Sequence, residues 1–186
     1  QISVEAALLT RRSVRTYSDA PLTLPEAGQL LWAAQGITDP NGFRTAPSAG
    51  ALYPLELYLV VKSVDRLSPG IYHYLPNDHQ LRLLSEGEVS DQLSIAALRQ
   101  SAVKNAPVVI VFTAVPERTT ARYGERGMQY VFMEAGHAAQ NVCLQAVALD
   151  FGTVTIGAFD EDEVRTHLNL PESEIPLYLL PVGRPL

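Results

Sequence analysis

The sequence has a single cysteine, Cys143, only two lysines and no long hydrophobic run. One cysteine cannot form an intrachain disulfide, and it cannot build a cysteine-based zinc site. The longest apolar runs, such as residues 108–112, are far shorter than the roughly 20 residues that a membrane-spanning helix needs. The four histidines do not fall at metal-ligand spacing, and there is no nucleotide fingerprint, phosphate loop or nucleophile elbow. These absences exclude several familiar enzyme classes and favour a reducing compartment such as the cytoplasm.

Length, composition and charge further limit the class of protein to which the chain can belong. We expect one domain spanning residues 1–186, and the 47% hydrophobic and 18% charged residues are typical of a globular protein. Residue 1 is Gln rather than Met, so we expect a trimmed chain or a fragment. The formal charge of −6, without an extended basic stripe, argues against nucleic acid as a partner. Twelve of the 14 basic residues are arginines, which suit phosphate recognition, although a coding bias would give the same excess.

The chain alternates between helical and strand patterns. Thr23 and Glu26 have the spacing of a capping box, and Gly36 is placed to end the helix that they begin. Residues 37–54 are rich in proline and glycine and predict a shaped loop. Further helices are expected at about residues 3–11, 90–98, 128–149 and 160–168, and strands at 55–61, 70–84 (a hairpin), 107–115, 153–159 (strand or loop) and 177–182. Helices and strands in this mixed order predict an α+β layered domain.

The expected helix at residues 128–149 is apolar around much of its circumference. Such a helix needs cover on several sides, so we expect it in the middle of the molecule or in a subunit interface. Cys143 lies in an apolar stretch of this helix and is expected to be a small core residue rather than a reactive thiol.

A cluster of basic residues follows the first expected helix and contains Arg11, Arg12 and Arg15, with Ser13 between them. Arginines at this position could simply offset the negative end of the helix dipole. Three arginines and a serine within five residues are more than that task requires, and a phosphate dianion needs several charge-assisted donors. We interpret the cluster as a site for a small anion, and Arg184 near the other end of the chain is a further candidate donor.

Two loops are suited to a planar ligand. The segment 46–54 (APSAGALYP) combines small residues, which let a ligand approach the backbone, with prolines that fix its shape. An ordinary loop rich in proline and glycine would have the same composition. The segment 152–160 (GTVTIGAFD) contains Gly157, whose amide has no side chain in its way.

Together these stretches resemble the flavin-dependent nitroreductase family, and most closely its SagB-type dehydrogenase branch. The motifs that carry the resemblance are RRSVRTY at 11–17, PSAGALYP at 47–54, RYGERGMQYVFMEAGHAAQN at 122–141, IGAFD at 156–160 and LPVGRP at 180–185. Each motif is modest alone, but five in the same order over nearly the whole chain are specific. The resemblance implies an α+β fold in which helices surround a mixed sheet. It also implies a homodimer that binds one FMN at each of two shared interface sites.

The resemblance further implies which residues bind the FMN. Arg11, Arg12 and Ser13 would hold its phosphate and ribityl chain, and Arg184 would reach the phosphate from the C-terminal motif. Arg15 would lie beside the pyrimidine edge of the flavin, where a positive charge stabilises the reduced ring. The other residues implied to line the flavin site are Pro47, Ser48, Ala49, Gly50, Tyr53, Ile156, Gly157 and Ala158.

For the flavin ring itself, the resemblance implies a packing surface and a hydrogen-bond donor. Pro47, Ser48 and Ala49 would pack on the ring from the partner subunit. The amide of Gly157 would donate to N5, the nitrogen through which hydride passes. Other nitroreductases favour an Asn at the position of Ala51 and a Glu at that of Gly157, so here the backbone would contact the flavin edge.

A further departure concerns a Lys-Tyr pair that is associated with catalysis in branch members that oxidise azolines on peptides. The matching residues are Arg122 and Tyr123. Arginine is not a base near neutral pH, so we do not expect proton abstraction by Arg122. Tyr123 is the candidate catalytic residue, as a proton donor or in positioning a substrate, and an interface tyrosine is the alternative interpretation.

The resemblance therefore implies an FMN-dependent oxidoreductase that passes hydride from NADPH or NADH to a small molecule such as a nitroaromatic, quinone or enone. A SagB-type dehydrogenase that oxidises a heterocycle or a peptide-derived azoline is one alternative. The chain has no long insertion to serve as a peptide-binding lid, which favours small-molecule chemistry. A flavin-binding module without turnover is the other alternative. Neither a metal nor a membrane is expected to take part.

Overall fold

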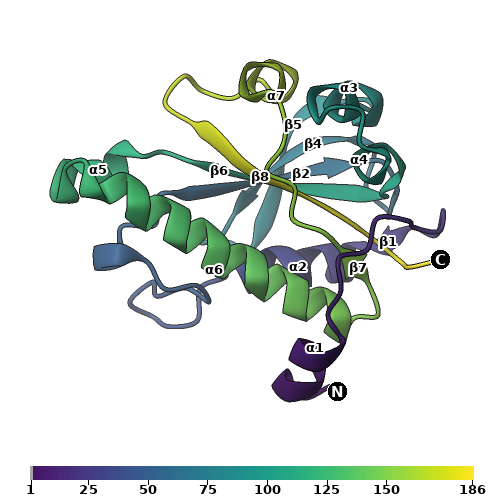
Figure 1. The fold of residues 1–186 in the computed structure, drawn as a ribbon, viewed down its shortest axis with the longest axis horizontal. Coiled ribbons are helices and arrows are strands. Elements are labelled where there is room, and N and C mark those ends of the chain that lie inside the picture. The colour runs from purple at the N-terminus through teal and green to yellow at the C-terminus, as the bar shows by residue number, and fades with distance from the viewer. Residues whose placement is uncertain (1) are drawn as a thin grey trace.

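A six-stranded sheet with helices on both faces forms the centre of the computed structural model, which describes residues 2–186 (Figure 1). The strands lie in the order β5-β4-β2-β6-β8-β7, and each neighbouring pair in this sheet is antiparallel. Parallel pairing occurs between the short strands β1 and β3 and at a bridge from Ser13 to Thr153. The bounds of the strands are Leu22–Thr23 (β1), Leu55–Val61 (β2), Val64–Asp65 (β3), Gly70–Leu75 (β4), Gln80–Glu86 (β5), Val108–Ala114 (β6), Gly152–Thr153 (β7) and Ile175–Gly183 (β8).

The helices form two layers, one on each face of the sheet (Figure 1). One layer contains α2 and the long helix α6, with α1 and α5 packed against α6. The other layer contains α3, α4 and α7. The bounds of the helices are Val4–Thr10 (α1), Leu24–Gln35 (α2), Ser90–Ala96 (α3), Ser101–Asn105 (α4), Glu117–Tyr123 (α5), Arg126–Ala148 (α6) and Glu161–Leu168 (α7). This arrangement confirms the predicted α+β fold, in which helices surround the sheet.

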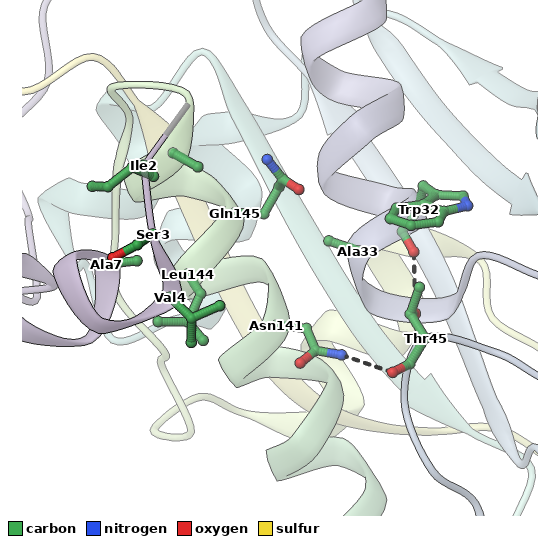
Figure 2. Close-up of a pocket in the computed structure, with 11 residues that line it drawn as sticks. Ile2, Ser3, Val4, Ala7, Trp32, Ala33, Thr45, Asn141, Leu144 and Gln145 are labelled. Carbon is green, nitrogen blue, oxygen red and sulfur yellow. Dashed lines mark hydrogen bonds between the residues drawn. The ribbon is translucent and has the colours of Figure 1, made fainter. Parts of the chain in front are cut away.

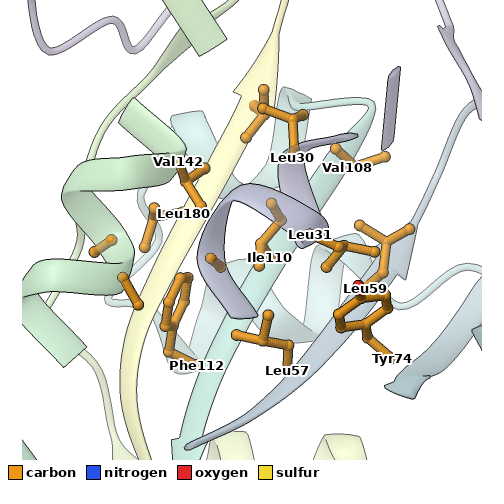
Figure 3. Close-up of a cluster of buried hydrophobic side chains, with 14 of the residues drawn as sticks. Leu30, Leu31, Leu57, Leu59, Tyr74, Val108, Ile110, Phe112, Val142 and Leu180 are labelled. Atoms are coloured by element: carbon orange, nitrogen blue, oxygen red, sulfur yellow. The ribbon is translucent and has the colours of Figure 1, made fainter. Parts of the chain in front are cut away.

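The central strands are buried on both faces because successive side chains of a strand point to opposite sides of the sheet. In β6, Ile110 and Phe112 belong to the core beneath α2 and α6, whereas Val109 and Val111 belong to the core beneath α3, α4 and α7. Figure 3 shows the first of these cores, where side chains of α2, α6 and the central strands meet. Within the β-branched run at residues 107–115, β6 therefore forms a fully buried strand, as the composition predicts.

Local capping signals set the starts of three helices. Thr23 Oγ1 accepts the backbone N–H of Glu26 at 3.4 Å, and the Glu26 carboxylate accepts the backbone N–H of Thr23 at 2.7 Å. The helix that begins with this capping box, α2, ends before Gly36. The side chains of Ser3 and Asp160 likewise accept N–H groups at the starts of α1 and α7. These caps confirm the helix starts predicted from the sequence.

The long helix α6 has 23 residues and is about 34 Å long. Val131, Ala135 and Val142 are buried on its inner side, whereas Phe132 and Met133 are exposed on its outer side. One side of α6 thus lies in the molecular interior, and the other presents apolar side chains to solvent. Within residues 2–186, no helix combines the length and the apolar character that crossing a membrane requires.

Several short elements differ from the prediction. The sequence pattern does not predict α4 or α5, and neither helix begins with a side-chain cap, since the residues before them are Gln100 and Pro116. Residues 153–159 contribute only the end of β7 and a bridge between Ile156 and Leu179. The two-residue strands β1 and β3 pair across a long stretch of sequence. Such elements depend on tertiary contacts that no local pattern encodes.

Candidate functional site

The basic segment near the start of the chain lies beside the motif near its end. The N–H of Val14 donates to the Thr153 carbonyl at 3.0 Å, and the N–H of Ser18 donates to the Arg184 carbonyl at 2.9 Å. Ser13 forms a parallel bridge with Thr153. The structure therefore brings Ser13 and Arg184 to the same edge of the sheet, next to β7.

A cavity of about 360 Å³ opens at this edge, and we call it the anion-side cavity. The Arg12 guanidinium donates to the carbonyls of Leu9 at 3.0 Å and Arg11 at 2.7 Å, so backbone contacts hold it in place. Arg15 is exposed nearby. One acid, Asp150, also lines the cavity, which is therefore not purely cationic. The complete lining is Thr10, Arg12, Val14, Val147, Asp150, Phe151 and Pro185.

Arg184 already has partners within the chain. Its guanidinium donates to Glu26 Oε1 at 2.8 Å and lies 4.7 Å from the centre of the Phe151 ring. Burial raises the pKa of Glu26, but hydrogen bonds from Thr23 and the charge of Arg184 together lower it below its ordinary value. Glu26 is therefore ionised at neutral pH, and it holds Arg184 between the start of α2 and the anion-side cavity.

The second predicted segment, residues 47–54, contains a single 3-10 turn, Ala49–Ala51. Gly50 has a φ of 63°, in the left-handed region that favours glycine. A Cβ on Gly50 would lie 2.8 Å from Tyr123 Oη and 3.0 Å from Arg122 Nη1. The structure thus brings the candidate catalytic residue Tyr123, together with Arg122, onto this segment.

Tyr53 fixes the end of the segment. Its N–H donates to Ser48 Oγ at 2.9 Å, and its carbonyl accepts a hydrogen bond from the Arg118 guanidinium at 3.1 Å. Its ring lies 4.5 Å from the Arg44 guanidinium carbon, and its hydroxyl accepts the Arg44 backbone N–H at 3.3 Å. Tyr53 therefore holds the conformation of the loop, and a direct contact between Tyr53 and flavin stays a prediction.

An ionic network supports this loop from the sheet. Glu56 of β2 lies 2.6 Å from the Arg118 guanidinium and 2.8 Å from His73 Nε2. Burial raises the pKa of Glu56, but the contacts with His73 and Arg118 together lower it below its ordinary value. The other hairpin histidine, His79, instead contacts the Tyr74 hydroxyl at 2.9 Å. In the part of the chain that the structure describes, no three His, Cys, Asp or Glu residues are grouped to hold a metal ion.

A second cavity, of about 240 Å³, lies beside Pro47, Ser48 and Ala49, and we call it the loop-side cavity. Glu134 of α6 lines it and is only 3% exposed. Among residues 2–186, Glu134 Oε1 finds no hydrogen-bond partner. Burial raises the pKa of Glu134 to about 7, although a hydrogen bond with Ser48 and the charge of Arg44 act to lower it. The motif comparison did not single out Glu134.

The third predicted segment is anchored to the last strand of the sheet. Ile156 exchanges two backbone hydrogen bonds with Leu179, each 2.9 Å long. Gly157 and Ala158 follow and are exposed. A Cβ on Gly157 would meet only the Tyr178 ring, at 3.6 Å, so the space around Gly157 would accept a side chain. The bridge at Ile156 thus fixes the position of the exposed Gly157 amide.

Within one chain, the two cavities lie at different halves of α6. Val147 lines the anion-side cavity, and Glu134 lines the loop-side cavity. These residues are 13 positions apart (147 minus 134), which corresponds to about 20 Å along a helix. One chain therefore separates the residues that the resemblance assigns to the FMN phosphate from those that it assigns to the packing surface of the ring.

An apolar groove of about 260 Å³ lies between α1, α2 and α6 (Figure 2). At its side, Asn141 Nδ2 donates to the Thr45 carbonyl at 3.3 Å, and the Thr45 hydroxyl donates to the Trp32 carbonyl at 3.2 Å. These bonds tie the long loop to both helices. None of the predicted site residues lines this groove, so it is separate from the two cavities described above.

Comparison with known proteins gives a match over nearly the whole chain. The model of the Nitroreductase family matches residues 8–184. A candidate nitroreductase of Methanocaldococcus jannaschii is 48% identical over 184 residues, which cover 99% of this chain and 92% of that protein. The structure of a candidate nitroreductase from Ralstonia eutropha has a TM-score of 0.87 at 26% identity, over 100% of this chain and 84% of that chain. One from Anabaena variabilis has a TM-score of 0.86 at 30% identity, over 98% of this chain but only 38% of that chain.

A microcin-processing protein and a trifolitoxin operon protein are also similar to this chain. The Escherichia coli microcin B17-processing protein McbC is 24% identical over 160 residues, which cover 83% of this chain and 59% of that protein. The trifolitoxin operon protein TfxC of Rhizobium leguminosarum bv. trifolii is 23% identical over 192 residues, or 95% of this chain and 54% of that protein. The chain thus spans just over half the length of these two relatives.

Proposed function

The chain belongs to the nitroreductase family of oxidoreductases, and from this membership we propose that it is an FMN-dependent enzyme acting on small molecules. A bound FMN would supply hydride transfer through N5, with NADPH or NADH as the donor and a nitroaromatic, quinone or enone as the acceptor. The observation that carries the proposal is the meeting of the basic N-terminal segment with Arg184 beside β7. It joins the two segments that carry these candidate donors, one from each end of the chain, at the same edge of the sheet.

The residues at this edge suit a phosphate group. Ser13 offers a hydroxyl, and Arg11, Arg12 and Arg184 offer guanidinium N–H groups, which bind phosphate through charge-assisted hydrogen bonds. Backbone carbonyls and Glu26 orient two of these guanidinium groups before any ligand binds. Less side-chain freedom is then lost on binding, which favours affinity.

We further propose that the active form is a homodimer that joins the two cavities. The anion-side cavity and the loop-side cavity lie about 20 Å apart along α6, which a second subunit can bridge. In a twofold dimer the same surface of both subunits is used, so two α6 helices crossing in opposite directions would bring unlike cavities together. The exposed Phe132 and Met133 on the outer side of α6 supply apolar surface for this contact.

A second candidate function is the SagB-type oxidation of a heterocycle or peptide-derived azoline. It is favoured by the similarity to McbC and TfxC and by the position of Tyr123 against Gly50. In this function Tyr123 would donate a proton or orient the substrate, whereas Arg122 would serve as a fixed charge.

The proposal is tested first by the colour and reduction of the purified protein. We expect a yellow protein whose visible flavin absorbance bleaches when NADPH or NADH is added without oxygen. A yellow protein that neither nicotinamide reduces would favour the SagB-type dehydrogenase. A colourless protein that takes up no added FMN would exclude both functions.

The site assignment is tested by comparing arginine substitutions. We expect the double substitution Arg11→Ala with Arg184→Ala to lower FMN affinity by tenfold or more, or roughly 1.4 kcal/mol, since it removes two charge-assisted donors. Arg122→Ala is the matched control, because Arg122 lies against Gly50 rather than at the anion-side cavity, and it should change FMN affinity much less. Fluorescence titration with FMN measures both, and equal effects would contradict the assignment of the phosphate end.

A further inference from the structure

Two glutamate side chains, Glu134 and Glu174, are buried among residues 2–186. They differ in the hydrogen bonds that their carboxylate oxygens accept. Glu174 accepts hydrogen bonds from the Tyr58 hydroxyl, 3.0 Å from each oxygen, and from the Thr113 hydroxyl at 2.6 Å. Glu134 is 3% exposed, yet its Oε1 has no partner in the described chain. A buried, ionised oxygen without a hydrogen-bond partner lowers the free energy of unfolding, so we infer that Glu134 has a role beyond packing.

Glu134 is connected to the loop that is predicted to pack on flavin. The loop-side cavity is bounded by Glu134 on α6 and by Pro47, Ser48 and Ala49 on the loop. The Ser48 oxygen accepts the N–H of Tyr53, and the Ser48 hydroxyl acts to lower the pKa of Glu134. The protonation state of Glu134 is therefore linked to Ser48 at the wall of the cavity.

We propose that Glu134 is a positioning residue that takes up a proton when FMN covers the loop-side cavity, and so couples flavin binding to pH through Ser48. The inference rests on the proposed function, because FMN supplies the covering surface. A ligand over the cavity excludes water from the carboxylate, and loss of water favours the neutral form of an acid. The proton comes from solvent, and only an O–H bond forms. The protonated carboxyl can then act as a hydrogen-bond donor.

The surroundings of Glu134 support a titration near neutral pH. The charge of Arg44 lowers the pKa of Glu134, and the charge of Glu56 in turn raises the pKa of Arg44. Desolvation outweighs both this charge and the Ser48 hydrogen bond, which leaves the pKa of Glu134 at about 7. The titratable and charged groups nearest this region are Arg44 from the loop, Glu56 from β2, Arg118, Arg122 and Tyr123 from α5, and Tyr130 and His137 from α6 itself.

The test compares FMN affinity at pH 6 and pH 8.5 for the wild type, Glu134→Gln and His137→Gln. Glutamine keeps the shape of a protonated glutamate but does not titrate. His137→Gln is the matched control, because it introduces the same side chain at another position that lines the same cavity. We expect the dissociation constant of the wild type, divided by that of Glu134→Gln, to rise about tenfold between the two pH values. The phosphate of FMN titrates equally in both measurements, so the ratio removes its contribution.

A second measurement needs no variant and remains decisive if Glu134→Gln fails to fold. At pH 8 the FMN phosphate is already a dianion, whereas a carboxyl with a pKa of about 7 is mostly ionised. We therefore expect the wild type to take up about half a proton per FMN bound at pH 8, the amount that corresponds to a tenfold change in affinity. Calorimetry in two buffers of different ionisation enthalpy measures this number.

The outcomes separate this inference from the proposed function. A pH-independent ratio, the absence of proton uptake, or loss of the pH dependence in His137→Gln would overturn the role of Glu134 while FMN binding itself stood. A wild type that binds no FMN at any pH would overturn the proposed function, and the coupling with it.

Discussion

Gly50 is the residue at which the predicted flavin loop touches α5. Its φ of 63° suits glycine, and a Cβ would lie 2.8 Å from the hydroxyl of Tyr123. We expect Gly50→Ala to lower the free energy of unfolding by about 1–2 kcal/mol and to displace Tyr123. The control is Gly136→Ala, because Gly136 lies within α6 with open space around it, and alanine there should stabilise by up to about 1 kcal/mol. Thermal unfolding measures both, and shifts of the same sign would count against this account of Gly50.

Glu134 also makes stability depend on pH. Its folded pKa of about 7 lies above the ordinary value of 4.5, so the folded protein binds the proton more tightly than the unfolded chain. The stabilisation is fully present below about pH 4.5 and is lost as pH rises through 7. We expect a loss of about 3 kcal/mol between pH 4.5 and pH 8 that is absent in Glu134→Gln. Urea unfolding at several pH values measures it, and parallel curves for the two proteins would refute it.

At the residue scale, sequence motifs predict the arginine and serine donors near the N-terminus, but they do not predict the role of the buried Glu134. The clustering of Arg11, Arg12 and Ser13 is visible in the sequence because adjacent residues form it. Glu134 lies between the buried apolar residues Val131 and Ala138 at helical spacing, which is the signal by which it could have been found. Its missing hydrogen bond and its contact with Ser48 depend on the loop, which no spacing rule positions.

The start of α2 links an element of secondary structure to the predicted site. Thr23 caps the helix together with Glu26, and Glu26 also pairs with Arg184. We expect Thr23→Ala to lower the free energy of unfolding by about 1 kcal/mol, since it removes a cap. Thr166→Ala, at an exposed position within α7, should be neutral or slightly stabilising. Chemical unfolding distinguishes the two, and a Thr23→Ala protein as stable as the wild type would contradict the role of the cap.

Elements with local signals are predicted well, and short elements without them are not. The bounds predicted for β2 agree with the structure, and the long helix begins two residues earlier than expected. In contrast, α4 and α5 lack side-chain caps, and α5 matters because it carries Tyr123. A helix of seven residues is stabilised mainly by packing, so its formation depends on contacts with α6 that are distant from the local pattern.

At the scale of the whole molecule, the proposed dimer predicts which exposed side chain matters. Phe132 on α6 and Ile95 on α3 are both 54% exposed, but they lie on opposite layers of the fold. We expect Phe132→Asp to convert a dimer into a monomer and to lower FMN affinity at least tenfold, because a buried charge would disrupt the apolar contact. Ile95→Asp should remain a dimer. Light scattering after size-exclusion chromatography measures the mass, and a dimeric Phe132→Asp protein would contradict this arrangement.

The order of motifs along the sequence predicts the family and the layered fold, and the resemblance implies a flavin site shared between two subunits. The structure adds a distance, because the loop-side cavity with Ser48 and the anion-side cavity with Arg12 lie at different halves of α6. Sequence order contains no distance between segments that meet only through tertiary packing. The distance between the two cavities along α6 is therefore known only from the structure.

The pairing of the two chain ends beside β7 has a consequence for how the protein folds. The Tyr17 hydroxyl contacts the carbonyl of Pro181, 164 residues away in sequence, and the chain between them must be largely ordered before this contact can form. Contacts of such long range are entropically expensive and are expected to form late in folding. A partly folded chain would then lack the anion-side cavity altogether. Uptake of a phosphate-bearing cofactor would report that folding is complete, rather than nucleate it.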